Sequence, residues 1–205
     1  NKSASYQYDV YKFASSLVSG KKDKVVDIGC GPATKLVKII GKKTKNIIGL
    51  DQDSAIQFCK KQYKFGSFYK VDLESVGNNF NKVQNPNLII CSDVIEHLIN
   101  PDNLLRLIKQ IANQNTHIVI STPDRDKLRG KSCMKSNKKE HIREWNFNEF
   151  RTYIDNSGLK TIEHFNNAPL KLSIYSWRDW LFHKTRGNND GMEFKWNQVL
   201  HCKLI

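Results

Sequence analysis

Apolar residues recur along this chain in two alternating patterns, one typical of buried strands and one typical of helices. Short runs rich in valine, isoleucine and leucine predict five strands, at Val25–Ile28, Asn46–Leu50, Phe68–Val71, Leu88–Ser92 and His117–Ser121. Segments with helical spacing lie between or ahead of them, at Tyr8–Val18, Lys35–Ile40, Ser54–Gln62 and Asn103–Ala112. Such alternation predicts a parallel sheet covered on both faces.

The pattern changes after Pro123. A polar, basic stretch continues to about Arg143 and is expected to form a loop above the carboxyl ends of the strands. Helical spacing resumes at Phe147–Ile154, where Asn146 and Glu149 form a plausible capping pair. Two last strands, Leu159–Phe165 and Val199–Ile205, are expected to pair like a hairpin around an insertion that contains Trp177, Trp180 and Phe182.

These elements predict an α/β fold with a doubly wound, mostly parallel seven-stranded sheet of the Rossmann-like kind. We expect one domain over residues 1–205, because 205 residues suit one hydrophobic core better than two. It would carry a basic loop at 124–143 and an insertion at about 167–198 that resembles a lid.

Composition limits the classes of protein to which the chain can belong. No apolar run approaches the roughly 20 residues of a membrane span, and the first residues do not resemble a signal peptide. The five cysteines are odd in number and include no C-x-x-C pair, which favours reduced thiols in a cytoplasmic protein. The net charge of +13 favours anionic partners such as nucleic acid, although scattered lysines beside many asparagines also suit a general compositional bias.

The first strand runs into a glycine turn, Asp27-Ile28-Gly29-Cys30-Gly31, followed by Pro32, which suits the first position of a helix. Glycines are needed where a ligand approaches the backbone more closely than a Cβ permits. A dinucleotide-binding fingerprint would place a third glycine at position 34, and Thr34 stands there instead. NAD is therefore disfavoured.

The segment from about Val25 to Leu159 resembles the class I S-adenosylmethionine-dependent methyltransferases, whose first motif is an acidic residue, a spacer and Gly-x-Gly. The resemblance implies S-adenosylmethionine as the cofactor. It also implies that Asp51 binds the ribose hydroxyls and that Asp72 and Leu73 lie against the adenine. The implied cofactor-binding residues are Asp27, Gly29, Cys30, Gly31, Asp51, Gln52, Asp72, Leu73, Ser92 and Asp93.

A second constellation follows the fourth strand. Asp93, Glu96 and His97 have the spacing i, i+3, i+4 and would share one face of a helix. Together with the later His141 and Trp145 they resemble two branches of the family: the ubiquinone-pathway O-methyltransferases, and the metal-dependent enzymes that methylate the terminal 2′-hydroxyl of small RNAs. The second branch implies a divalent metal held by Glu96, His97 and His141.

Two chemistries remain open for this constellation. A hydroxyl acceptor must lose its proton, either to a histidine base or with the help of a metal ion that lowers its pKa. In both cases His97 and His141 are the expected catalytic residues. We expect O-methylation of a small polar or anionic, saccharide-like acceptor; the alternatives are RNA 2′-O-methylation and a non-catalytic cofactor-binding or scaffold protein.

Two alternative roles are open for the basic loop, and two for the tryptophans. The loop would either contact phosphates or be an ordinary solvated loop, and its cations are Arg125, Lys127, Arg129, Lys131, Lys135, Lys138 and Lys139. Trp177 and Trp180 would either stack on a sugar or base or simply pack within a lid helix. The sequence leaves the oligomeric state open.

Overall fold

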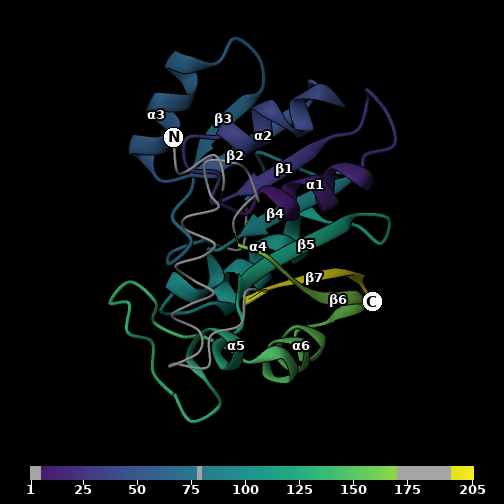
Figure 1. Cartoon of the computed structure of the whole chain (residues 1–205). Helices are drawn as coiled ribbons and strands as arrows, with labels where there is room; N and C mark the ends of the chain where they lie inside the picture. Colours follow the sequence, from purple (N-terminus) through teal and green to yellow (C-terminus); the bar gives the residue numbers. More distant parts are fainter. Residues whose placement is uncertain (1–5, 78–79, 170–194) are drawn as a thin grey trace, which may run out of the picture.

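A computed structural model of the chain describes residues 6–77, 80–169 and 195–205. A seven-stranded sheet runs through the middle of the molecule in the order β3-β2-β1-β4-β5-β7-β6 (Figure 1). The strands are β1 (Val25–Ile28), β2 (Ile47–Asp51), β3 (Ser67–Lys70), β4 (Leu88–Ser92), β5 (His117–Pro123), β6 (Leu159–Asn167) and β7 (Asn197–Leu204). The predicted fold class is confirmed.

The first five strands are parallel, and the last two form an antiparallel pair. Val26 lies opposite Ile48 of β2 and Ile89 of β4, so β1 is central and buried on both faces. β7 pairs antiparallel with both β5 and β6, which confirms the expected pairing of the last two strands. A register shift in β6 falls between Thr161 and Glu163.

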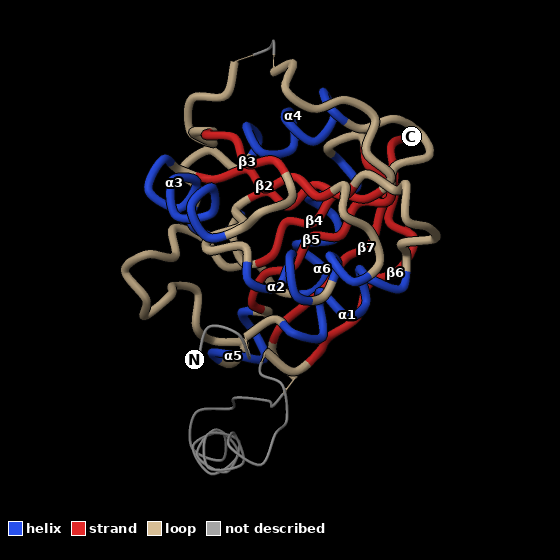
Figure 2. Tube along the Cα trace, turned by 90° about the horizontal axis from the view of Figure 1, so that it is seen from above, coloured by secondary structure: helices blue, strands red, loops and turns tan. Residues whose placement is uncertain are grey.

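Helices cover both faces of the sheet (Figure 2). Apolar residues of α1 (Tyr8–Ser16), α2 (Thr34–Lys38) and α3 (Asp53–Gln62) share one core cluster with Val25, Ile47 and Ile90. Those of α4 (Asp102–Ile111) and α6 (Phe147–Asn156) share the other with Val26 and Ile89. Neighbouring residues of β1 face opposite clusters because successive side chains of a strand point to opposite faces. The described residues also form three short helical turns, α5 (Arg125–Arg129), η2 (Ile40–Lys42) and η3 (Ile95–His97).

Two local expectations were wrong. Pro32 does not open a helix: Ala33, in the left-handed region with φ 52°, caps α2, which begins at Thr34. The stretch after Pro123 is not loop throughout, because Asp124 caps α5 by accepting hydrogen bonds from the backbone N–H groups of Asp126 and Lys127. The Asn146–Glu149 capping box of α6 is confirmed.

The insertion expected at about 167–198 lies mostly outside the described residues, and with it Trp177, Trp180 and Phe182. Its expected ends belong to strands, because Asn167 closes β6 and Asn197 opens β7. Among the described residues, no helix is long and apolar enough to cross a membrane. All five cysteines are free thiols, and Cys30 and Cys91 are buried, as expected of small apolar side chains.

Candidate active site

The glycine turn after β1 is shaped by close packing. Gly29 has φ 74°, and a Cβ on it would lie 2.2 Å from Cγ2 of Val94. Gly31 has φ 52°, and a Cβ there would meet nothing within 4 Å. The N–H of Gly31 donates to Oδ2 of Asp51 at 2.7 Å, which holds the turn against the end of β2. Only glycine combines this backbone with these surroundings at position 29.

A cavity of about 280 Å³ opens beside this turn, at the carboxyl ends of the first four strands. Six of the residues expected to bind a cofactor line it: Gly29, Asp51, Gln52, Asp72, Leu73 and Asp93. The other lining residues are Val71, Glu74, Val94, His97 and Leu98. Open α/β sheets bind their ligands at this edge. We refer to this space as the cofactor cavity.

Asp27 lies beneath the turn and does not line the cofactor cavity. It is fully buried and accepts a hydrogen bond from the hydroxyl of Tyr11 at 2.8 Å. Its other oxygen, Oδ1, has no hydrogen-bond partner among the described residues. Burial raises the pKa of Asp27 to about 7, against the opposing effects of Tyr11 and Lys35. Asp27 therefore changes charge near neutral pH.

Asp93 is fixed by side chains from distant parts of the chain. Its Oδ2 accepts a hydrogen bond from the amide of Gln7, just ahead of α1, and its Oδ1 accepts one from Ser121 at 3.2 Å. Ser121 in turn lies 2.8 Å from the hydroxyl of Ser92. Burial raises the pKa of Asp93. Ser92 therefore positions Asp93 through Ser121 and does not itself line the cofactor cavity.

Asp93 also overturns one expectation. With φ 53° it is in the left-handed region, so it does not share a helical face with Glu96 and His97. Those two residues belong to the 3₁₀ turn η3 instead. The three side chains nevertheless line one space, a second cavity of about 330 Å³. We refer to it as the acceptor cavity; its walls are Tyr6, Gln7, Asp93, Glu96, His97, Pro123, Lys138, Glu140, His141 and Trp196.

The two cavities meet at Asp93 and His97, which line both of them. A group bound in one cavity therefore lies next to a group bound in the other. This is the arrangement that transfer of a small group between two ligands requires, because alignment of the reacting atoms supplies much of the rate.

His97 and His141 are held in the same manner. Nδ1 of His97 lies 2.8 Å from the carbonyl oxygen of Glu140, and Nδ1 of His141 lies 2.6 Å from Oε1 of Glu144. A carbonyl or ionised carboxylate oxygen only accepts, so Nδ1 is the donor in both rings. In the neutral imidazole, Nε2 then carries the lone pair. The rings lie edge to face with their centroids 4.8 Å apart.

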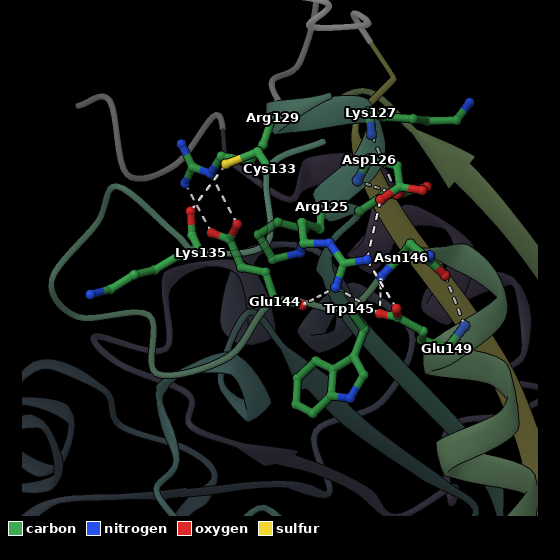
Figure 3. A network of polar contacts seen from close by, with 12 residues as sticks. Arg125, Asp126, Lys127, Arg129, Cys133, Lys135, Glu144, Trp145, Asn146 and Glu149 are labelled. Atoms are coloured by element: carbon green, nitrogen blue, oxygen red, sulfur yellow. Dashed lines mark hydrogen bonds and ion pairs between the residues drawn. The ribbon is translucent and has the colours of Figure 1, made fainter. Parts of the chain in front are cut away.

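Glu144 is the centre of a buried polar network (Figure 3). Besides His141, it accepts hydrogen bonds from Nε of Arg129 at 3.0 Å and from the hydroxyl of Ser136 at 2.8 Å. Burial raises the pKa of Glu144, but the hydrogen bonds from His141, Arg129 and Ser136 outweigh it and bring the value to about 2. The carboxylate of Glu144, which contacts Nδ1 of His141, is therefore ionised at neutral pH.

The basic loop is less available to phosphates than its composition suggests. Figure 3 shows Arg125 directed toward Glu149 and Arg129 toward Glu144. Arg125 forms a two-point ion pair with Glu149 at 2.8 and 2.9 Å. Both arginines are thus already paired, and the two strongest phosphate ligands expected in the loop hold it to the fold instead.

Glu96 contributes an incompletely satisfied carboxyl group to the acceptor cavity. It is fully buried, and Oε2 accepts a hydrogen bond from Thr122 at 3.0 Å. Oε1 has no partner among the described residues. Burial, followed by the charge of Asp93, raises the pKa of Glu96. Ligand atoms of Glu96, His97 and His141 all lie within 4.8 Å of one another, so the structure brings the predicted metal ligands together.

Comparison with known proteins decides the family. Residues 6–164 match the family model described as a methyltransferase domain. The chain belongs to the methyltransferase domain family. It is an enzyme of the class I kind, and the cofactor of the family is S-adenosylmethionine. A search among curated proteins finds no significant sequence match.

Solved structures share the fold of this methyltransferase. A chain of the complex between the Haloferax volcanii Trm112 methyltransferase activator and a methyltransferase is 15% identical, with a TM-score of 0.74 over 98% of this chain and 90% of that one. An S-adenosylmethionine-dependent methyltransferase from Mesorhizobium loti is 11% identical, with a TM-score of 0.70 over 99% and 100%. Another, from Clostridium acetobutylicum, is 12% identical, with a TM-score of 0.63 over 100% and 92%.

Sequence reasoning missed several residues of the methyltransferase site. Tyr11 and Gln7 contact Asp27 and Asp93 across 16 and 86 positions of sequence, and no local pattern indicates such pairs. Of the missed residues, Glu144 could have been identified from the sequence. It follows His141 by three positions, a spacing at which a carboxylate and a histidine readily meet.

Proposed function

We propose that this methyltransferase transfers the methyl group of S-adenosylmethionine to a hydroxyl of a small polar acceptor, with His141 as the general base. One observation carries the proposal: the two histidines that line the acceptor cavity both donate from Nδ1, which leaves Nε2 as the ring nitrogen for the acceptor. The resemblance to the ubiquinone-pathway O-methyltransferases supports a hydroxyl acceptor.

His141 and Glu144 would act as a unit. A sulfonium methyl group is already activated, so the protein's task is to align the acceptor and to remove its proton. His141 would take that proton at Nε2. The anionic Glu144, 2.6 Å from Nδ1, would stabilise the imidazolium that forms. His97, whose Nδ1 donates to a neutral carbonyl, would accept a hydrogen bond and orient the acceptor.

The residues around the glycine turn fit S-adenosylmethionine. The open space beside Gly31 suits a ligand that approaches the backbone closely. Asp27, buried beneath the turn, would act on the cofactor only through the turn that it supports. Asp51 would bind the ribose hydroxyls, with Gln52 beside it, while Asp72 and Leu73 would contact the adenine. Cys30 and Gly31 would contribute backbone only.

The acceptor cavity supports a small, polar substrate. Its volume of about 330 Å³ is at the lower end for small-molecule sites. Tyr6 and Trp196 offer aromatic faces of the kind that pack on sugar rings, and Lys138 offers a cation to an anionic group. A saccharide-like acceptor with a carboxylate or phosphate suits these walls. RNA 2′-O-methylation is less well supported, because Arg125 and Arg129 are committed to ion pairs.

A divalent metal is a second candidate for the acceptor cavity. The unpartnered Oε1 of Glu96 and the clustering of its ligand atoms with those of His97 and His141 suit an ion with nitrogen and oxygen ligands. Hydrogen bonds from Nδ1 to a carbonyl and a carboxylate are also what metal-bound histidines commonly make. Such an ion would lower the pKa of the acceptor hydroxyl. Elemental analysis of the purified protein and of His97→Ala tests this candidate.

An acceptor screen tests the proposed function. The purified enzyme is incubated with S-adenosylmethionine labelled in the methyl group and with matched alcohols, amines and thiols on sugar and aromatic frameworks. We expect transfer to alcohols, lost in His141→Gln. Transfer confined to amines or thiols would contradict the hydroxyl assignment. Binding of S-adenosylhomocysteine without transfer to any acceptor would favour the non-catalytic alternative.

A further inference from the structure

The end of the sheet opposite the active site carries an unusual concentration of lysine. The segments that meet there lead into the strands or end β7: residues 19–24, 41–46, 63–66, 84–87, 112–116 and 203–205. They contain eight lysines, Lys21, Lys22, Lys24, Lys42, Lys43, Lys45, Lys64 and Lys203, and one acidic residue, Asp23. We call this end the lysine pole. It holds seven of the thirteen net positive charges of the chain.

The lysine pole and the active site face away from each other. Because β1 to β5 are parallel, their amino ends share one edge of the sheet and their carboxyl ends the other. The C-terminus, which follows Lys203, lies at one end of the strands, and the loop after α5 lies at the other (Figure 1). A large ligand on the lysine pole would therefore leave both cavities open.

Two similar segments form the centre of the pole, Gly20-Lys21-Lys22-Asp23-Lys24 and Gly41-Lys42-Lys43-Thr44-Lys45. Thr44 joins them: its hydroxyl lies 2.8 Å from the carbonyl oxygen of Asp23 and 3.0 Å from that of Lys21. The carboxylate of Asp23 accepts hydrogen bonds from the backbone N–H groups of Ser19 and Gly20. The one acidic group of the pole is thus occupied by its own turn.

Further contacts join these two segments to their neighbours along the same edge of the sheet. The ammonium of Lys45 lies 4.3 Å from the ring centroid of Phe65, in the segment before β3. The ammonium of Lys24 donates to the carbonyl of Gln84, and Thr116 donates to that of Pro86. Five neighbouring segments are therefore fixed relative to one another, which lowers the entropic cost of binding a partner.

The exposed lysines of the pole have no acidic partner. Lys21, Lys22, Lys42, Lys43 and Lys64 are exposed, and no ion pair to them occurs among the described residues. Exposed amides lie among them, at Asn46, Asn87, Gln114 and Asn115. Lysine ammonium groups and amide N–H groups are common ligands of phosphate and sugar oxygens in nucleic acids.

We propose that the lysine pole binds the phosphate backbone of a nucleic-acid duplex without reading its sequence. The segments contain no arginine for two-point contacts to guanine, and their aromatic residues, Tyr63 and Phe65, are half-buried, so bases have little on which to stack. Ile205 is the one exposed large apolar side chain in the described segments, which disfavours insertion into a membrane. Many unpaired point charges on segments that are fixed relative to one another suit the repeated phosphates of a duplex backbone.

Fluorescence anisotropy with a labelled DNA duplex of about 20 base pairs tests the proposal, at salt concentrations from about 50 to 200 mM. The test variant is Lys22→Gln/Lys42→Gln/Lys43→Gln. The matched control, Lys131→Gln/Lys135→Gln/Lys139→Gln, removes the same net charge from the basic loop. We expect the pole variant to lower the slope of log affinity against log salt by about 2.7, and the control to change it little. Saturating S-adenosylhomocysteine should leave duplex binding unchanged.

Several results would overturn the proposal: no binding of the wild-type protein, equal losses in both triple variants, or competition by S-adenosylhomocysteine. Vesicles rich in phosphatidylserine provide the membrane arm of the test. Binding to vesicles that is sensitive to the pole variant, without duplex binding, would assign the pole to a lipid surface instead. Thermal unfolding of both variants verifies that the exposed substitutions leave the fold intact.

Discussion

His141 and Glu144 form a hydrogen-bonded pair in which Nδ1 of the histidine lies 2.6 Å from Oε1 of the carboxylate. Arg129 and Ser136 hold the same carboxylate from other directions. The pair therefore couples the start of the basic loop to the acceptor cavity. Its geometry leaves Nε2 as the nitrogen of His141 that carries the lone pair, and the proposed chemistry depends most on this feature.

Glu144→Gln should lower kcat about 10²-fold or more, because an amide cannot stabilise the imidazolium that forms during proton removal. The affinity for S-adenosylhomocysteine should be unchanged. Glu149→Gln is the matched control, since it also removes a carboxylate paired with an arginine, Arg125. Steady-state kinetics with the best acceptor of the screen measure both variants. Equal kcat in wild type and Glu144→Gln would show that the pair has no role in proton transfer.

Asp27→Asn should stabilise the ligand-free fold increasingly as pH rises. The pKa of Asp27 is about 7 in the fold and 3.8 without burial, so the native state binds a proton that the unfolded state releases. Proton binding by Asp27 stabilises the native state fully below about pH 4, and this stabilisation is lost as the pH rises through 7. The free energy of unfolding of Asp27→Asn, relative to that of wild type at the same pH, should therefore rise by up to about 4 kcal/mol between pH 4 and pH 8. Urea unfolding at both pH values measures it, and a pH-independent difference would contradict it.

Asp51→Asn should weaken binding of S-adenosylhomocysteine by about 1.5–3 kcal/mol for each charge-assisted hydrogen bond lost to the ribose. Asp53→Asn is the control, because Asp53 is exposed two positions further on and does not line the cofactor cavity. NAD should give no binding signal with any of these proteins. Isothermal calorimetry provides the measurement. Preference for NAD, or equal affinity in Asp51→Asn and wild type, would refute the role of Asp51.

Gly29→Ala should destabilise the fold by about 1–3 kcal/mol, since the new Cβ would stand in a left-handed backbone and 2.2 Å from Val94. Gly29→Ala/Val94→Ala should recover the part due to the clash and retain the part due to the backbone. Gly20→Ala is the control, because a Cβ there meets nothing within 4 Å. Denaturant unfolding separates the contributions. Full recovery in the double variant would show that φ at this position costs nothing.

The sheet was predictable from sequence because its signals are local. β1 and β4 have the predicted bounds, since each is a run of apolar residues that parallel pairing buries on both faces. The capping box of α6 was likewise local, with Asn146 and Glu149 three positions apart. Errors arose where backbone conformation departs from the common regions: Ala33 and Asp93 both have positive φ, which alanine rarely adopts and which aspartate adopts more often than most residues but not at predictable positions.

The candidate site was predictable only in part. Residues at strand ends could be placed, because parallel strands bring their carboxyl ends to one edge. The ion pairs of the basic loop could not, since Arg125 and Arg129 find their partners 24 and 15 positions later. The same limit applies to Gln7 and Tyr11, whose contacts depend on how α1 packs against the finished sheet. The contacts of these residues are determined by how distant segments pack in the folded chain, and no local sequence pattern indicates them.

The chemical position of the transferred methyl group tests directly whether this enzyme methylates a hydroxyl through His141. S-adenosylmethionine with a ¹³C-labelled methyl group is incubated with wild-type enzyme and the best acceptor, and the product is analysed by NMR. We predict a labelled methyl group bonded to oxygen, absent from the product mixture of His141→Gln. A label bonded to nitrogen, sulfur or carbon, or an O-methyl product that His141→Gln forms at the wild-type rate, would contradict it.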